Sequence, residues 1–370
     1  MYSAFLDRTR QSIEALKRHL ATSETVRSVI YEKTSTCNAT PPCMSLPLSS
    51  ETAPDRIEWR IIDHCAAVTR IYAIYEQFAH EMIKEHIDLL QKNVVFSQLP
   101  NELKSAYRRG LATILEKKDG PRYGHIDLQD LVAQYGQALS DKPYVLEPLA
   151  LAIQEQNLRI PELSRLMAAC GIPNIGAWIS KHASVLNFFS NGDRLAASAE
   201  HEMVELISYR NDAAHGSINI DDLPGLDYLY EFCDFVSAIC EAITERVQLT
   251  GIECLLENGR AEIKGKADEC IKSGMVLIGK MVGDFQIGDT IYLRGDDFCM
   301  AREITSMQID NVDYENISFA APTELGFAIN RPGRKNAEII ALRPVDHKPP
   351  VGSTTIPIEL SNATATELGP

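Results

Sequence analysis

The residues best suited to chemistry are Arg210, Asn211 and His215, in the segment Tyr-Arg-Asn-Asp-Ala-Ala-His-Gly at 209–216. On a helix, Asn211 and His215 share a face because they are four residues apart. Histidine transfers protons near neutral pH, the planar guanidinium matches phosphate oxygens, and an amide can orient an imidazole. RNA supplies its own nucleophile, the ribose 2′-hydroxyl, so these groups predict RNA cleavage with neither metal nor cofactor.

An arginine followed by histidine after four to six intervening residues is a weak signal by itself. The chain contains this spacing twice, at Arg210 to His215 and at Arg194 to His201. A chain of this composition gives about one or two such matches by chance. The first match stands apart because it also has the adjacent Asn211, an Ala-Ala-His-Gly ending and a long helical segment after it. We therefore interpret Arg194 and His201 as surface residues.

Basic residues that could touch an RNA backbone form small groups. Arg108 and Arg109 stand with Lys117 and Lys118 on one predicted helix, and a second group lies in one loop of the C-terminal region. That second group is Arg331, Arg334 and Lys335. Either group could neutralise phosphates, and the alternative for each is an ordinary solvated surface.

The elements that must position the motif are helical. Between residues 61 and 89, apolar residues recur at alternating steps of four and three, which predicts a helix of about 35 residues with a buried seam. His86 lies on this seam, so we expect a core histidine. A last helix is expected over 227–247, and Gly216 is placed to end the motif helix. The other predicted helical segments are 1–22, 101–118, 128–139, 148–156, 161–169 and 194–214.

After Gly251 the pattern changes to short β-rich runs separated by Gly and Asp turns, which predicts a small barrel or sandwich. The expected strands are 252–257, 261–264, 275–281, 290–293, 301–308, 312–319, 325–329 and 337–342. The resulting division is an N-terminal helix with a mobile Ser/Thr/Pro-rich loop at 1–54, a helical domain at 55–250, a barrel at 251–346 and a disordered tail at 347–370.

Composition narrows the class of protein. The net charge of −15 argues against a broad basic surface that coats nucleic acid. Neither a leader sequence nor a membrane-spanning run is apparent, and the nine cysteines show no paired spacing. We therefore expect a cytoplasmic protein with reduced thiols, no metal cluster and no membrane association. The segment from Gly274 to Lys280 matches a phosphate-binding loop in part, but Met281 stands where magnesium chemistry needs Ser or Thr.

The motif resembles the ribonuclease motif of HEPN domains (higher eukaryotes and prokaryotes nucleotide-binding), in which Arg-Asn-x-x-Ala-His-Gly precedes a final helix. Residues 68–79, with the sequence Val-Thr-Arg-Ile-Tyr-Ala-Ile-Tyr-Glu-Gln-Phe-Ala, resemble the long early helix of prokaryotic members. The resemblance covers about 55–250. It implies an all-α bundle that dimerises with two motifs facing each other, and metal-independent RNA cleavage in toxin–antitoxin or antiviral systems. Arg210, Asn211 and His215 would then form the site.

The C-terminal region resembles the barrel that follows the GTPase domain in translation elongation factors. The segments 279–290, 301–308 and 324–329 carry this likeness, mainly in turn glycines and strand alternation. The resemblance implies contact with tRNA, other translation RNA or a partner protein.

Together these observations predict a multi-domain protein, an all-α HEPN-type bundle followed by a small all-β barrel. The leading hypothesis is a homodimeric endoribonuclease that acts on RNA and is neutralised or activated by a protein partner. The alternative is a catalytically inactive adaptor that dimerises through its helices and binds a partner protein or the translation machinery through the barrel.

Overall fold

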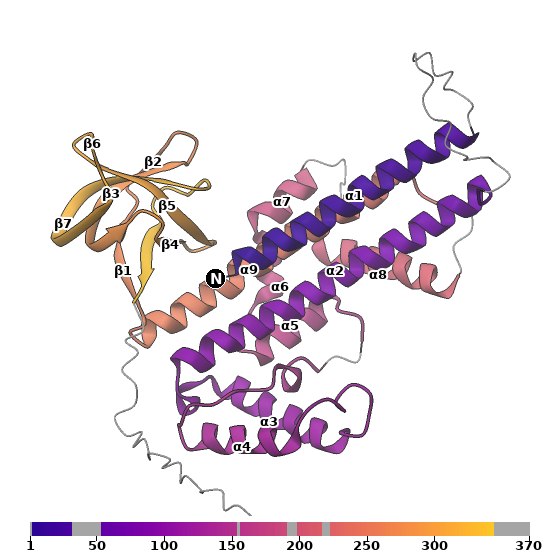
Figure 1. The fold of residues 1–370 in the computed structure, drawn as a ribbon, viewed down its shortest axis with the longest axis horizontal. Helices are drawn as coiled ribbons and strands as arrows, with labels where there is room; N and C mark the ends of the chain where they lie inside the picture. Colours follow the sequence, from indigo (N-terminus) through magenta and orange to yellow (C-terminus); the bar gives the residue numbers. More distant parts are fainter. Residues whose placement is uncertain (1, 32–52, 154–155, 191–197, 217–222, 344–370) are drawn as a thin grey trace, which may run out of the picture.

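The computed structural model describes residues 2–31, 53–153, 156–190, 198–216 and 223–343 (Figure 1). Its helical elements are α1 (Ser3–Tyr31), α2 (Arg56–Asn93), η1 (Phe96–Gln98), α3 (Asn101–Glu116), α4 (Leu128–Leu139), η2 (Pro148–Ala150), α5 (Ile160–Ala169), α6 (Ile175–Lys181), α7 (Ala183–Ser190), α8 (Ala199–His215) and α9 (Leu226–Glu257). Its strands are β1 (Ala261–Lys266), β2 (Glu269–Ile271), β3 (Val276–Gln286), β4 (Thr290–Arg294), β5 (Cys299–Ile309), β6 (Val312–Tyr314), β7 (Asn316–Ile329) and β8 (Glu338–Leu342). The predicted mobile loop lies almost entirely outside the described residues, and so does the whole predicted tail at 347–370.

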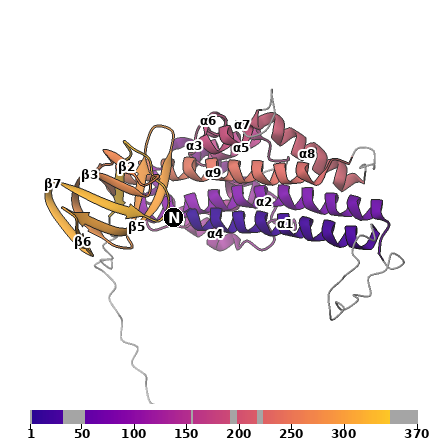
Figure 2. The same cartoon turned by 90° about the horizontal axis from the view of Figure 1, so that it is seen from above.

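Three long helices, α1, α2 and α9, lie side by side and form the spine of the helical region (Figures 1 and 2). The seam of α2 is buried along its length, including Val68, Tyr75 and Met82, so the predicted amphipathic helix is confirmed. His86 is buried on the same seam, and burial lowers its pKa to about 4. It is therefore a neutral core histidine, as its position on the seam predicted.

Helix α1 is longer than the sequence pattern indicated. It continues past residue 22 to Tyr31 because its last turns meet α2 through a buried polar cluster. The guanidinium of Arg27 lies 2.9 Å from a carboxylate oxygen of Asp63, which also accepts a hydrogen bond from Ser23 at 2.7 Å. Such charge-assisted hydrogen bonds satisfy a buried arginine. The spacing of apolar residues therefore did not predict the last turns of this helix.

The middle of the helical region contains short helices, and the spacing of apolar residues predicted only some of them. The helix predicted at 148–156 is wrong, since only the 3₁₀ turn η2 forms there among the described residues. Its carbonyl at Ala150 abuts Gly110 of α3, where an added Cβ would lie 1.7 Å from that oxygen. Helices α6 and α7 were not predicted. Phe188 and Phe189 of α7 pack on Phe235 of α9.

Helix α9 does not stop at Gly251, so the strand predicted at 252–257 is wrong and the helix ends at Glu257 instead. Gly251 is a point of close packing rather than a helix terminator. A Cβ there would lie 2.8 Å from Leu89 Cδ2 and 3.2 Å from the Tyr2 hydroxyl. Ile252 and Leu255 continue the buried face of the helix. Glycine occurs here because the neighbouring chain leaves no room for a side chain.

The strands form a closed antiparallel barrel, as predicted. The ring runs β1-β8-β4-β5-β7-β3, and a pairing of β1 with β3 at Gly265 and Met281 closes it. Strands β2 and β6 pair with β3 and β5 outside this ring. Alternate residues such as Leu277, Leu325 and Phe327 point inward and fill the barrel core.

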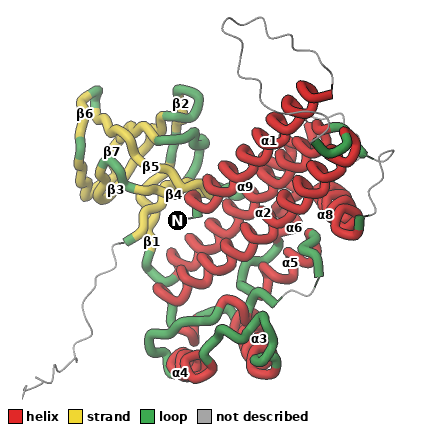
Figure 3. Tube along the Cα trace, turned by 45° about the vertical axis from the view of Figure 1, so that its right-hand side comes forward, coloured by secondary structure: helices red, strands yellow, loops and turns green. Residues whose placement is uncertain are grey.

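The barrel sits directly on the bundle at the end of α9 (Figure 3). Its residues Tyr292, Cys299 and Ile340 belong to the same buried core as the long helices rather than to the barrel interior. The two regions therefore share apolar packing. Among the described helices, none combines the length and apolarity that a membrane span needs.

Candidate active site

The motif occupies the last turns of α8. Ser198 caps the start of this helix by accepting a hydrogen bond from the His201 N–H at 3.2 Å, and Gly216 ends it with a φ of +67°. The predicted helix terminator is thus confirmed, because glycine adopts this left-handed conformation at little energetic cost. One face of α8 packs against α2 through Met203, Leu206 and Ile207.

The side chain of Arg210 is held from three sides. Its Nη1 donates to Asn211 Oδ1 at 3.0 Å and to Asn157 Oδ1 at 3.4 Å. Its guanidinium lies 4.9 Å from the centroid of the Tyr72 ring, within cation–π range. Asn157 Nδ2 also approaches Asn211 Oδ1, at 3.5 Å. The structure therefore brings Arg210 and Asn211 together and fixes the guanidinium before any substrate binds.

Tyr72 connects this cluster to the long helix α2. Its hydroxyl accepts a hydrogen bond from the Leu158 N–H at 2.8 Å and donates to Glu76 Oε1 at 3.3 Å. Burial raises the pKa of Tyr72 to about 12, so the phenol stays protonated at neutral pH. Because Leu158 adjoins Asn157, this bond fixes the segment that holds Arg210.

His215 lies at the exposed end of α8, one turn beyond Asn211 on the same face. Within the described residues its imidazole has no hydrogen-bond partner. The side-chain oxygen Oδ1 of Asn211 accepts from Arg210 and Asn157, not from His215. That Asn211 orients the imidazole stays a prediction. The arrangement offers a fixed cation for phosphate and, five residues further along the same helix, a solvent-accessible group for proton transfer.

Neither Asn157 nor Tyr72 was predicted from the sequence. Tyr72 stands on the apolar seam of α2, where a core role is the natural interpretation. Asn157 lies in an irregular segment with no periodicity or motif. In the second spacing match, Arg194 lies outside the described residues. His201 is exposed in the first turn of α8, as expected for a surface residue.

The predicted RNA-contacting groups lie apart from the motif. Arg331 Nη2 donates to both carboxylate oxygens of Asp7 in α1, at 2.9 and 3.0 Å. Arg334 lies 3.6 Å from Asp297 and 4.6 Å from the Phe298 ring centroid. Lys335 is exposed in the same loop, and Arg108 and Arg109 are exposed on α3. RNA contact by all five residues stays a prediction.

The barrel lies away from the motif within the chain. Tyr209 of α8 packs against Tyr228 and Phe232 in the first turns of α9, whereas the barrel follows the last turn of α9. Figure 2 shows α8 and the barrel toward opposite ends of the long helices. Phe232 and Gln248, the α9 residues that contact Tyr209 and the barrel residue Cys299, are about 24 Å apart along the helix axis. The basic loop of the barrel is therefore separated from Arg210 of the same chain by several helical turns.

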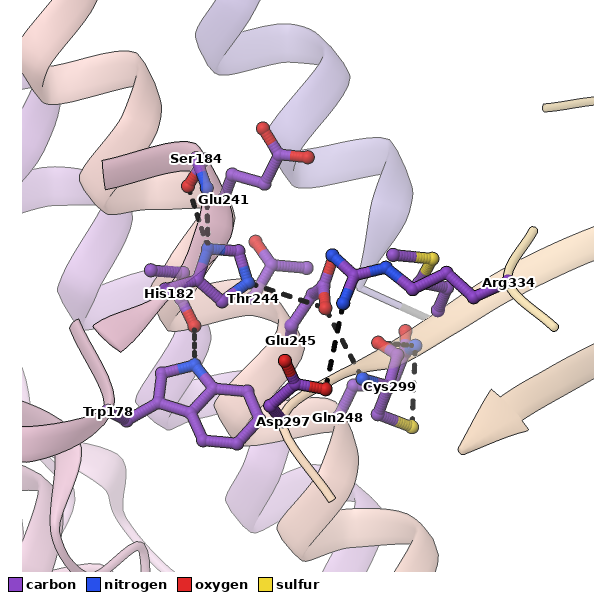
Figure 4. Close-up of polar contacts among 12 residues, drawn as sticks. Trp178, His182, Ser184, Glu241, Thr244, Glu245, Gln248, Asp297, Cys299 and Arg334 are labelled. Carbon is purple, nitrogen blue, oxygen red and sulfur yellow. Dashed lines mark hydrogen bonds and ion pairs between the residues drawn. The ribbon is translucent and has the colours of Figure 1, made fainter. Parts of the chain in front are cut away.

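A second polar cluster lies where the barrel meets the bundle (Figure 4). His182 Nε2 lies 3.4 Å from Glu245 Oε2, which accepts a hydrogen bond from the Cys299 N–H at 3.3 Å. Gln248 Nε2 donates to the Cys299 carbonyl at 2.7 Å. Glu245, Gln248 and Cys299 are all buried. Because Glu245 and Gln248 of α9 both bond to the backbone of Cys299 in β5, we interpret the cluster as the connection that orients the barrel.

Within the described residues, no group of three or more His, Cys, Asp or Glu side chains is arranged to hold a metal ion. The seven cysteines in the described part of the chain are free thiols.

Comparison with known proteins identifies the family of the helical region. No curated protein gives a significant match. Two matching solved structures are the C-terminal domain of a putative U32 peptidase from Geobacillus thermoleovorans and its selenomethionine variant. They are 12% and 13% identical, cover 22% of this chain and 93% and 98% of theirs, and have TM-scores of 0.20 and 0.19. The model of the RiboL-PSP-HEPN family matches residues 47–248, more than half of the chain, and the protein therefore belongs to the HEPN family.

Proposed function

We propose that the protein is a metal-independent endoribonuclease whose site is formed by Arg210, Asn211 and His215. The observation that supports this most strongly is the fixed guanidinium of Arg210, which Asn157, Asn211 and the Tyr72 ring hold on the helix that ends with the exposed His215. A pre-positioned cation stabilises a charged transition state without reorganising during the reaction. A purely structural arginine would not need a proton-transfer group one helical turn away.

The proposed reaction is a transesterification within the RNA. The ribose 2′-oxygen attacks the adjacent phosphorus and loses its proton to His215, while the bond from phosphorus to the 5′-oxygen breaks. The leaving 5′-oxygen takes a proton from solvent or from the second motif of a dimer. Arg210 stabilises the charge on the phosphorane. The products are a 2′,3′-cyclic phosphate and a 5′-hydroxyl.

The proposed setting is a homodimer in a toxin–antitoxin or antiviral system, with tRNA or another translation RNA as substrate. The exposed position of His215 at the end of α8 leaves room for a second copy of the motif. Static light scattering at micromolar concentration tests the assembly. A mass near 82 kDa, twice the chain mass of 41.1 kDa, is expected, and a monomer would refute the dimer.

The remote position of the barrel favours a second candidate function. A module separated from the motif by several turns of α9 can recruit a partner protein or the translation machinery without taking part in cleavage. A protein that uses its helical region only for dimerisation would be such an adaptor.

A cleavage assay with purified protein and single-stranded RNA in excess EDTA distinguishes the ribonuclease from the adaptor. We expect cleavage that leaves a 2′,3′-cyclic phosphate, that a 2′-deoxyribose at the cut position blocks, and that His215→Ala reduces by about 10²–10⁴-fold. Arg210→Lys should also reduce cleavage, because an ammonium lacks the planar fork. Arg194→Ala and His201→Ala are the matched controls and should cleave like wild type. A requirement for metal or a 5′-phosphate product would refute the mechanism. Loss of cell growth on induced expression of wild type but not of His215→Ala would support the toxin setting.

A further inference from the structure

A cavity of about 860 Å³ adjoins the motif and is not used by the mechanism above. Its lining residues come from α2, from α8, from the start of α5 and the segment before it, and from Arg122 between α3 and α4. Asn157 connects the cavity with the motif, because it lines the cavity and also contacts Arg210 and Asn211. The cavity is of the size that binds small ligands or parts of larger ones.

The cavity and the motif lie along one face of α8. Glu200 and Val204 line the cavity, and Asn211 and His215 follow them at spacings of seven and eleven residues from Val204. These spacings keep all four residues on the same side of a helix. Val204 and Asn211 are about 10 Å apart along the helix axis. A strand bound at Arg210 would therefore pass directly by the cavity.

The lining of the cavity suits a nucleobase better than a phosphate chain. It contains three carboxylates, Glu76, Glu162 and Glu200, against the guanidiniums of Arg122 and Arg159. A polyanion would meet net repulsion there. Carboxylates accept hydrogen bonds only, so they recognise groups that donate. Pro161 and Val204 add apolar walls for a flat ring, and Gln156 and Asn157 add amides.

One carboxylate is free to act in this way. Glu162 pairs with Arg165 at 3.2 Å, and Glu76 accepts a hydrogen bond from Tyr72. Glu200 is exposed in the first turn of α8 and has no hydrogen bond or ion pair with any residue in the described part of the chain. Arg159, on the opposite lining segment, likewise has no side-chain partner among those residues.

We propose that this cavity is the subsite for one unpaired nucleobase of the substrate RNA, and that Glu200 selects guanine. Guanine alone among the four bases presents two adjacent N–H donors, N1–H and N2–H, that a carboxylate can accept together. Unpaired bases in RNA are read through this edge. Arg159 contacts the backbone phosphate beside that base. The choice of RNA as ligand rests on the function proposed above.

Binding to short oligonucleotides tests the proposal separately from cleavage. The probes are 5′-labelled oligouridines with one central guanine, inosine, adenine or cytosine. Their affinity for the full chain carrying His215→Ala is measured by fluorescence anisotropy. We expect the guanine probe to bind about tenfold more tightly than the adenine or cytosine probe, with inosine weaker than guanine because it lacks the N2 amino group. In the same background, Glu200→Gln should remove the preference. Glu205→Gln, an exposed carboxylate on another face of α8, should keep it. Arg159→Ala should weaken all probes equally.

The outcomes separate the two proposals. Equal affinity for all probes, no measurable binding, or a guanine preference that survives Glu200→Gln would overturn the subsite. A wild-type protein that cleaves RNA but shows no base dependence would retain the ribonuclease function and lose the subsite. A protein that cleaves nothing yet shows the Glu200-dependent guanine preference would retain the subsite and lose the ribonuclease function.

Discussion

The contact between Asn157 and Arg210 gives the sharpest test of how the site is held. Asn157→Ala removes one acceptor of the Arg210 guanidinium and one donor to Asn211. A hydrogen bond to a charged group contributes ~1.5–3 kcal/mol, and this one, at 3.4 Å, belongs at the lower end. If the loss of about 1.5 kcal/mol falls on the transition state, cleavage slows about tenfold.

The assay is single-turnover cleavage at saturating RNA, together with thermal unfolding of the same samples. We expect kcat to fall about tenfold with an unchanged pH profile, because His215 is untouched. Asn187→Ala is the matched control, since Asn187 is exposed on α7. An Asn157→Ala protein that cleaves at the wild-type rate would refute the positioning role. One that loses activity only in proportion to its folded fraction would show a structural role instead.

Four further predictions concern stability. Gly110→Ala should destabilise the protein by about 3 kcal/mol or more, since the new Cβ would lie 1.7 Å from the Ala150 carbonyl oxygen. Gly136→Ala in α4, with open space around it, should stabilise the protein by about 0.5–1 kcal/mol. If urea unfolding shows that both glycine variants change the free energy of unfolding in the same direction, this reasoning is contradicted. Burial lowers the pKa of His86 to about 4, so between pH 6.5 and 4 the unfolded chain binds a proton that the folded chain does not, and stability falls as the pH falls. His86 alone should account for a loss of about 2 kcal/mol at pH 5 relative to pH 7, and His86→Leu should reduce that difference; an unchanged difference would exclude His86 as its source. Arg331→Ala should change stability by no more than about 1 kcal/mol, because its pair with Asp7 is largely exposed, and a much larger change in the urea midpoint would show that this pair holds the barrel in place.

Several features of this protein followed from the sequence because their causes are local. The buried seam of α2 follows from the spacing of apolar residues, and the end of α8 at Gly216 follows from the freedom of glycine at positive φ. Strand alternation and turn residues located the barrel, although they divided the long strand β7 in two. The motif was recognisable because Arg210, Asn211 and His215 are neighbours in the chain.

The tertiary structure decided whatever depends on residues far apart in the chain. At Gly251, local propensity indicates the end of a helix, yet α9 continues because Leu89 and Tyr2 pack against that position. The pairing of Arg331 with Asp7 of α1 joins residues from opposite ends of the chain, and no local pattern indicates it.

The support of the site depends on the same kind of long-range proximity. Tyr72, Asn157 and Arg210 are separated by more than fifty residues at each step, and only the packing of α8 on α2 brings them together. A periodic pattern reports which side of an element is buried. It does not report which distant side chain lies opposite, because that depends on how the helices pack against one another.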